Sequence, residues 1–573
     1  MSPANPKTPA NLNTPANLKR TANFKSTVRR PERADVCIIG AGASGAAAAK
    51  VLTEGGLRLV VLERGPWRKF EEFGADELAN INRNFLTPDP DLNPRTVRSS
   101  DTEDAVVGSF SPTPYLVGGG TTHWTGWVPR MVATDFVQRS LHGHVPGAGL
   151  ADWPVRYFEL EPYYSQVEWG LGVSGEAAAN RFQSPRSRPY PLPPLPPTRY
   201  AQRFRLGCDK LGWNSFPMPT AMLSQPYGGR LPTVQSAFVQ FHGDPSGTRS
   251  SVLATFIPEA QATGRMELRP GCYVRELRVD TAGRVTSALY EDEDGRLAEQ
   301  EADVFVLACN AIESARLLLL SRSGLFPDGL ANHSGLVGRY LTAHEYTEAI
   351  GVFTDGEPLY PWAGGGYISA GTFEFYASDY TRGFIGGGLV AAGSAGLPLP
   401  VNWSLPDRPA WGRAAKQFDR DFYNRSMSAG IVLNDLPQET NRVDLDPVVK
   451  DAWGLPVARV TYRAHPNDLA QANWLVDRCG DILEAAGASQ VRRNHIGELT
   501  GNSLHQHGTL RMGDDPETSV VDRWCRAHSV PNLYVVDGSS FPTPGGVNPT
   551  LTILANAWRV AEHLLQAGPG RAG

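Results

Sequence analysis

Two histidines and one asparagine near the carboxyl end carry side chains suited to removing a proton from an alcohol. The run Leu504–Thr509 reads LHQHGT and contains His505 and His507, and Asn548 lies in a Gly-Val-Asn-Pro run. A neutral imidazole is an effective general base near neutral pH, and a side-chain amide can hydrogen-bond an oxygen on which negative charge develops. In a strand the two histidines would lie on the same face, so their spacing does not decide which one is the base.

A glycine-rich loop near the other end of the chain has the features of a dinucleotide-binding site. Residues 36–39 predict a buried strand, residues 46–52 a helix, and residues 59–62 a second strand that ends on Glu63. Gly40 permits a tight turn, Gly42 lets the backbone approach a pyrophosphate, and Gly45 lets the helix pack close to the strand. The helix N-terminus supplies free N–H groups to the phosphates. The residues of this unit that we expect to contact the dinucleotide are Gly40, Gly42, Ala43, Ser44, Gly45, Glu63 and Arg64.

Composition is typical of a large soluble enzyme. A chain of 573 residues exceeds one ordinary core, which predicts two domains. With 54 Lys and Arg against 59 Asp and Glu, the net charge of -5 argues against binding to nucleic acid or to an anionic membrane. The six cysteines are scattered without a CxxC pair, which predicts mostly reduced core residues and no metal site. No apolar run approaches the roughly 20 residues that span a bilayer.

Residues 1–33 form a basic, polar segment in which Pro-Ala-Asn recurs. This composition predicts a disordered arm, with an electrostatic tether as the functional alternative. The segment lacks the continuous apolar core of a secretory signal, so we expect a cytoplasmic protein.

The order of expected elements predicts an α/β fold in which a Rossmann-like nucleotide domain is assembled from separated segments. Strands are expected near 266–268, 273–279, 285–291, 303–308 and 533–536, and helices near 467–486 and 551–565. We assign residues 34–150, 247–344 and 500–573 to the nucleotide domain. Residues 151–246 and 345–499 are assigned to a substrate domain with a mainly antiparallel sheet flanked by helices.

Three stretches carry a family resemblance: the glycine-rich loop, the run Ala308–Leu319 (ACNAIESARLLL) and the carboxy-terminal block with His505 and Asn548. Together they resemble the glucose–methanol–choline family of FAD-dependent oxidoreductases from about Ala34 to Leu565. Two branches compete. Residues 153–157, 173–175 and 190–196 are similar to bacterial gluconate and sugar dehydrogenase large subunits, whereas residues 117–125 are closer to pyranose oxidases and their glycoside-oxidising relatives.

One stretch departs from the dehydrogenase branch. Those enzymes often carry a cysteine-rich segment near residues 237–245, where this chain has no cysteine. An iron–sulfur centre at that position is therefore excluded by the lack of ligands.

The resemblance implies roles for individual residues. His505 matches the catalytic base and Asn548 its partner, while His507 is expected to support them and His344 to be structural. His123 matches the histidine that carries FAD covalently in pyranose oxidases, although non-covalent relatives also exist. Thr125 matches a threonine that faces the flavin. The residues beyond the first unit that we expect to contact FAD are Gly118, Gly119, Thr122, His123, Thr125, Val274, Asp537, Gly538, Asn548, Pro549 and Thr550.

The implied reaction is oxidation of a CH–OH group of a sugar, glycoside or polyol, with the hydride passing to flavin and the proton to an active-site histidine. A non-sugar alcohol is the nearest alternative, and a flavin-dependent lyase on the same fold is another. The electron acceptor is expected to be oxygen, a quinone or a redox protein, and the oligomeric state stays open.

Overall fold

The computed structural model describes most of the chain. The described residues are 28–74, 92–108, 110, 113–235, 242–361, 363–364, 368–394, 409–497 and 504–568. Most of the predicted N-terminal arm, residues 1–27, lies outside them, as do residues 237–241 of the cysteine-free stretch. Within the described ranges, no helix is both long and apolar enough to cross a membrane.

The largest sheet is mainly parallel and has both ends of the chain in it. β1 (Ala34–Ile39) lies between β2 (Leu59–Leu62) and β9 (Leu297–Leu307), and all three run parallel. β6 (Met266–Arg269) extends the sheet beyond β2, and β19 (Leu533–Val535) pairs with the second half of β9. The first half of β9 instead pairs antiparallel with β8 (Val285–Glu291), which pairs with β7 (Tyr273–Val279).

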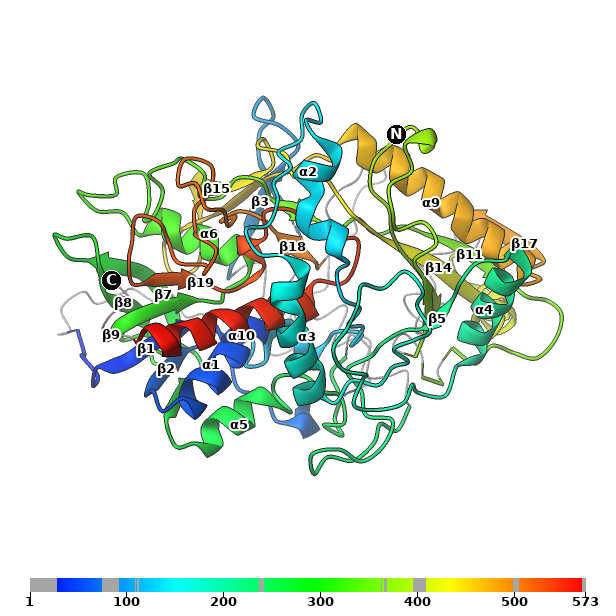
Figure 1. Cartoon of the computed structure of the whole chain (residues 1–573), viewed down its shortest axis with the longest axis horizontal. Helices are drawn as coiled ribbons and strands as arrows, with labels where there is room; N and C mark the ends of the chain where they lie inside the picture. Colours follow the sequence, from blue (N-terminus) through cyan, green and yellow to red (C-terminus); the bar gives the residue numbers. More distant parts are fainter. Residues whose placement is uncertain are drawn as a thin grey trace.

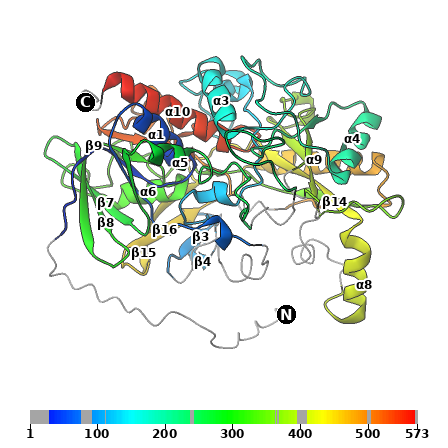
Figure 2. The same cartoon turned by 90° about the horizontal axis from the view of Figure 1, so that it is seen from below.

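Helices cover both faces of this sheet. α1 (Ala43–Glu54) packs against α10 (Thr550–Ala567) and α5 (Phe256–Ala262), and α3 (Tyr157–Leu171) packs outside α10 (Figure 1). α6 (Ala311–Leu320) lies on the opposite face, between the large sheet and a four-stranded sheet (Figure 2). That smaller sheet has the order β15 (Arg442–Lys450), β16 (Pro456–Thr461), β3 (Arg95–Arg98) and β4 (Val106–Gly108).

A second large sheet is antiparallel throughout. Its order is β17 (Gln490–Arg493), β11 (Glu348–Val352), β14 (Ser426–Leu433), β13 (Gly388–Ser394), β12 (Ala370–Thr372) and β5 (Phe216–Pro217). The helices α9 (Pro466–Ala485) and α4 (Arg199–Leu211) cover one face of it, whereas α8 (Gly412–Tyr423) projects from the body (Figure 2). All eight residues of β14 are buried, as expected for the central strand of a covered sheet.

The predicted fold class is therefore confirmed: a mixed α/β protein with a parallel nucleotide-binding sheet and an antiparallel second sheet. The domain boundaries given above remain a proposal. α2 (Gln138–His142) is a short helix outside these layers.

A two-stranded ladder brings the histidine run against a distant part of the chain. β10 (Thr342–Ala343) pairs antiparallel with β18 (Gln506–His507). Gly508 ends this pairing with a φ of +81°, and a Cβ there would lie 2.0 Å from the Tyr340 carbonyl oxygen. Only glycine fits this left-handed, crowded position without strain.

Candidate active site

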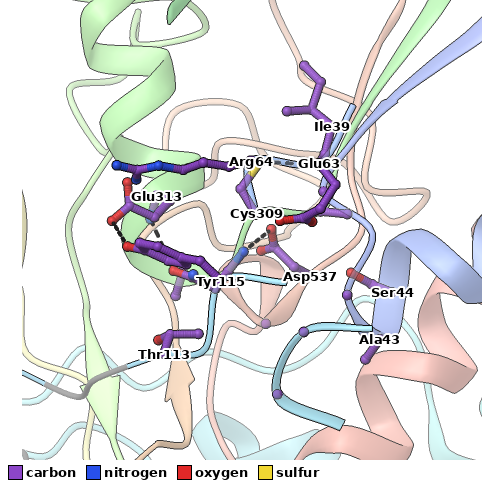
Figure 3. A pocket seen from close by; sticks show the side chains of 18 of the residues that line it. Ile39, Ala43, Ser44, Glu63, Arg64, Thr113, Tyr115, Cys309, Glu313 and Asp537 are labelled. Atoms are coloured by element: carbon purple, nitrogen blue, oxygen red, sulfur yellow. Dashed lines mark hydrogen bonds between the residues drawn. The ribbon is translucent and has the colours of Figure 1, made fainter. Parts of the chain in front are cut away.

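Three helices begin at one long cavity between the two ends of the chain. Ala43 at the start of α1, Ala311 at the start of α6 and Thr550 at the start of α10 all line it (Figure 3 shows some of the lining side chains, Ala43 among them). Helix N-termini present free N–H groups and a partial positive charge. At α6 the Asn310 side chain already accepts from the Ile312 and Glu313 N–H groups, whereas α1 and α10 have no side-chain cap. The N-termini of α1 and α10 are therefore the sites that the cavity offers to the phosphates of an anionic cofactor.

The glycine-rich loop has the backbone shape that a pyrophosphate requires. Gly40 adopts a φ of +103°, and a Cβ there would lie 2.4 Å from the Ala308 carbonyl oxygen. A Cβ on Gly42 would meet only the Gly119 Cα, at 4.0 Å, so bare backbone faces the cavity at this point. The loop thus passes close to β9 and α1 while leaving room for a ligand.

Glu63 ends β2 and is held by backbone groups. Its Oε2 accepts from the Ala41 N–H at 2.8 Å and its Oε1 from the Gly65 N–H at 2.8 Å. Burial raises the pKa of this carboxyl, and the two hydrogen bonds oppose the rise. Each oxygen keeps a further lone pair, which fits the predicted role of accepting from ribose hydroxyls.

One part of the cavity lining is a cluster of charged and aromatic groups. The Arg64 guanidinium lies 4.7 Å from the ring centre of Tyr115 and 4.3 Å from that of Tyr273. Glu313 accepts from the Tyr115 hydroxyl at 3.0 Å and from Arg95 at 3.1 Å (Figure 3 shows the Tyr115 bond). Burial raises the pKa of Glu313, but three surrounding guanidiniums outweigh burial and lower it to about 2.

Tyr115, Tyr273 and Glu313 were not among the predicted site residues, although each lines the cavity. Glu313 lies inside the run that carried the family resemblance, so that motif could have indicated it. Tyr115 precedes the second glycine-rich loop by two residues. Tyr273 carries no signal beyond its place next to Val274.

Asp537 joins the end of β19 to the start of α6. Its Oδ2 accepts from the Asn310 N–H at 3.1 Å and from the Ser314 hydroxyl at 2.6 Å, and its Oδ1 accepts from the Ser539 N–H at 2.9 Å. Burial raises the pKa of the carboxyl. Asp537 therefore ties the segment after β19 to the start of α6, and both segments line the cavity.

His505, which lines the cavity, meets Asn548. Asn548 Nδ2 lies 3.2 Å from His505 Nε2, although the two residues come from separate loops. Burial lowers the pKa of His505 to about 4, so its imidazole is neutral near neutral pH. A neutral ring with one nitrogen facing an amide is a chemically competent base.

His507 occupies a different environment. Its ring stacks on Phe541 with centroids 5.4 Å apart, and its Nδ1 lies 3.5 Å from the Thr342 hydroxyl. His505 lines the cavity and His507 does not. This placement favours His505 over His507 as the base.

His123 lies behind the cavity wall. It is 5% exposed and its ring meets Phe73 edge-on, with centroids 5.5 Å apart. Neither ring nitrogen has a side-chain hydrogen-bond partner within the described part of the chain. Burial, with smaller contributions from the nearby Arg249 and His242, lowers the pKa of His123 to about 3, and a hydrogen bond with the Thr122 backbone opposes the shift. The imidazole is therefore neutral near neutral pH.

The cavity brings together most of the residues predicted to contact the cofactor. Those lining it are Gly40, Gly42, Ala43, Ser44, Glu63, Arg64, Gly119, Val274, Asp537, Gly538, Pro549 and Thr550. Those outside its lining are Gly45, Gly118, Thr122, His123, Thr125 and Asn548. Among the described residues, no group of three or more His, Cys, Asp or Glu side chains is arranged to hold a metal ion.

Comparison with known proteins identifies the class. Two family models described as GMC oxidoreductase match residues 193–346 and 437–557. The chain is 35% identical to 2-methyl-1,2-propanediol dehydrogenase from Mycolicibacterium austroafricanum over 93% of its own length and 95% of that protein. It is 34% identical to 6'''-hydroxyparomomycin C oxidase from Streptomyces lividus, with 92% of each chain covered. It is 30% identical to the gluconate 2-dehydrogenase flavoprotein from Pantoea cypripedii, covering 94% of this chain and 95% of that one.

Solved structures share the fold at lower identity. Pyridoxine 4-oxidase from Mesorbium loti superposes with a TM-score of 0.61 at 18% identity, covering 93% of this chain and 99% of that one. A formate oxidase variant from Aspergillus oryzae RIB40 gives a TM-score of 0.63 at 13% identity, covering 95% and 99%. The chain belongs to the GMC oxidoreductase family, as predicted. It is an FAD-dependent enzyme, and the cavity described above fits that cofactor.

Proposed function

We propose that this enzyme oxidises a CH–OH group of a polyhydroxylated substrate, namely a sugar, a glycoside or a polyol, to the carbonyl. The observation that carries the proposal is the His505–Asn548 pair, 3.2 Å apart, with His505 on the wall of the cofactor cavity. Relatives named for paromomycin, gluconate and fructose oxidation support the substrate class.

The residues divide the work between cofactor binding and proton removal. The N-termini of α1 and α10, together with Glu63 and Asp537, would hold the cofactor. Bound FAD supplies the acceptor for the hydride. His505 Nε2 takes the hydroxyl proton of the substrate, and Asn548 Nδ2 donates a hydrogen bond to the oxygen as its negative charge grows. Burial keeps His505 neutral and ready to accept that proton.

His123 extends the proposal to the mode of cofactor attachment. Its ring is buried without a side-chain hydrogen-bond partner in the described chain, and its imidazole is neutral. An unprotonated ring nitrogen is a nucleophile. We therefore propose that FAD is attached covalently through His123.

A second candidate is a simpler diol. The relative named 2-methyl-1,2-propanediol dehydrogenase is 35% identical to this chain, and its named substrate is a diol without a sugar ring. Both oxidases and dehydrogenases occur among the relatives, so oxygen, a quinone and a redox protein all stay candidates for the electron acceptor. We also keep the proposal of a reducing, cytoplasmic setting, because all six cysteines are unpaired.

The deciding experiment follows the absorbance of the bound flavin without oxygen. Purified enzyme is mixed anaerobically with aldoses, glycosides, polyols and 1,2-propanediols in turn, and then re-oxidised with oxygen or a quinone dye. We expect sugars or polyols to bleach the flavin faster than the simple diols. Faster bleaching by the diols would favour the second candidate, and no bleaching by any alcohol would overturn oxidation of a CH–OH group.

A further inference from the structure

A line of buried polar groups continues from His505 away from the cavity. His505 Nδ1 lies 3.2 Å from His344 Nδ1, and His344 Nε2 lies 3.7 Å from Asp435 Oδ1. The latter distance exceeds a formed hydrogen bond. Neither His344 Nε2 nor Asp435 Oδ1 has a side-chain hydrogen-bond partner among the described residues, and His344 also makes a hydrogen bond with the Gly545 backbone. Each of the two side chains is only 1% exposed.

Backbone contacts hold the three side chains in this line. The His344 N–H donates to the His505 carbonyl oxygen at 3.2 Å, directly beside the β10–β18 ladder. The Ala343 N–H donates to Asp435 Oδ2 at 3.1 Å. Asp435 follows β14, so the antiparallel sheet fixes a carboxylate behind the histidines. The arrangement does not depend on a flexible surface loop.

We propose that His344 and Asp435 are positioning residues that set the protonation of His505 and carry away the proton it accepts. The inference rests on the proposed function, because it needs His505 to be the base. It replaces the structural role expected for His344 from the sequence.

The donor and acceptor groups around the two histidines favour one pair of tautomers. A carboxylate only accepts, so Asp435 Oδ1 favours a proton on His344 Nε2. His344 Nδ1 then accepts, and His505 must carry its single proton on Nδ1. The lone pair of His505 Nε2 is left facing Asn548 and the substrate hydroxyl. Asp435 thus orients the proton of His505 as the buried aspartate of a hydrolase triad orients its histidine. The difference is that the imidazole of His344 lies between Asp435 and His505.

Proton transfer along His505, His344 and Asp435 leaves every proton and charge accounted for. The substrate hydroxyl gives its proton to His505 Nε2, and His505 passes its Nδ1 proton to His344 Nδ1. His344 passes its Nε2 proton to Asp435 when a small side-chain movement closes the 3.7 Å between Nε2 and Oδ1 to hydrogen-bond length. Both imidazoles end neutral and Asp435 ends as a carboxylic acid. The negative charge of the carboxylate is replaced by that of the substrate oxygen, which is discharged when the hydride leaves the carbon.

Other titratable groups face this line. His507 lies beside His344 with ring centroids 4.6 Å apart. Burial lowers the pKa of His344 well below its usual value, the two other histidines lower it further, and a hydrogen bond with the Gly545 backbone opposes the shift. Behind Asp435 lie Asp468 and Tyr462, and Glu345 adjoins Tyr462.

The proposal gives a distinctive pH dependence. Burial raises the pKa of Asp435 to about 7, whereas His505 alone has a pKa of about 4. A protonated Asp435 would donate to His344, reverse both tautomers and place a proton on His505 Nε2. Flavin reduction should therefore fall as the pH drops through about 7 if the line acts as a unit, and only through about 4 if His505 acts alone.

Asp435→Asn tests the line directly. The Ala343 N–H would hold the amide oxygen, so the amide nitrogen would face His344 Nε2 and donate to it. Both tautomers would then be inverted. We expect anaerobic flavin reduction at pH 8 to fall about 10²-fold with FAD content unchanged, and the limb near pH 7 to disappear. Asp468→Asn is the matched control, because burial and Asp435 raise the pKa of Asp468 well above its usual value and the amide mimics a neutral carboxyl.

The outcomes separate this inference from the proposed function. Wild-type rate and an unchanged pH profile in Asp435→Asn would overturn the relay, while loss of reduction in His505→Ala would still support the base. An equal loss in Asp468→Asn would also overturn it, because the effect would then be structural. If Asp435→Asn does not fold, neutron diffraction of the wild-type enzyme decides: a proton on His505 Nδ1 and His344 Nε2 supports the relay, and a proton on His505 Nε2 overturns it.

Discussion

At the scale of single residues, this site depends on burial acting on imidazoles. Three histidines, His344, His505 and His507, are packed within contact distance, and burial lowers the pKa of each of them. A cluster of protonated rings would be costly there because like charges would share a dry environment. Neutral rings can instead accept and pass protons, which is what oxidation of an alcohol requires.

His505→Ala should reduce the rate of anaerobic flavin reduction by about 10²–10⁴-fold, because it removes the group that accepts the hydroxyl proton. FAD content and the melting temperature should stay close to those of the wild type. Stopped-flow absorbance of the flavin with a saturating substrate measures the rate. His507→Ala is the comparison: if it abolishes reduction while His505→Ala does not, the two assignments must be exchanged.

His123→Ala should release the flavin from the polypeptide. In the wild-type enzyme we expect yellow fluorescence to stay with the protein band after denaturing electrophoresis, because the proposed bond to the ring nitrogen survives unfolding. In the variant the fluorescence should run with the dye front. Complete release of flavin from the wild-type enzyme by acid precipitation would refute attachment at this residue.

At the scale of elements, the two-residue strands β10 and β18 matter more than their length suggests. They bring His505 within 3.2 Å of His344, which lies 161 residues earlier in the chain. The contact depends on the close approach of Gly508 to the Tyr340 carbonyl. A small change in backbone geometry here would move the base relative to Asn548.

Gly508→Ala should destabilise the enzyme by about 3 kcal/mol or more, since left-handed strain adds to a steric overlap that the backbone must relieve. Gly454→Ala is a matched control with a φ of +78° and no atom within 4 Å of the added Cβ. It should cost only about 1–2 kcal/mol. Thermal unfolding of the two variants side by side measures the difference, and equal losses would contradict the role of the close approach.

At the scale of the whole molecule, a buried ion pair joins α6 to the four-stranded sheet beside the cofactor cavity. Arg316 on α6 donates to Asp451 at 2.7 Å and to the Pro456 carbonyl oxygen at 2.9 Å, between β15 and β16. Its side chain is 2% exposed and that of Asp451 is fully buried. Such a pair contributes little net stability when intact. Removing one partner leaves the other charge buried without an opposite charge beside it, which is costly.

Arg316→Met should therefore destabilise the enzyme by about 3–5 kcal/mol, because Asp451 would keep a buried and unpaired carboxylate. The exposed pair Arg523–Asp514 gives the comparison, and Arg523→Met should cost less than about 1 kcal/mol. Denaturant unfolding of both variants with FAD bound tests this contrast. Similar losses of stability in the two variants would contradict the special cost of leaving a buried charge unpaired.

The sequence by itself determined the nucleotide-binding unit and the family. The strand predicted at 59–62 is observed with the same bounds, and the helix predicted at 46–52 lies within α1. These elements have local signals, since apolar runs and glycine spacing are fixed by near neighbours in the chain. His505 and Asn548 were likewise recognisable from their motifs, although the roles assigned to them remain to be tested.

Only the tertiary structure decided which groups surround those two residues. It selected His505 over His507 for the cavity wall, placed Tyr115 and Glu313 beside Arg64, and set Asp435 behind His344. Strands of two residues leave no periodic pattern, and a single aspartate after a buried strand carries no motif. Contacts between residues more than 90 positions apart depend on how whole sheets pack, which spacing along the chain does not encode.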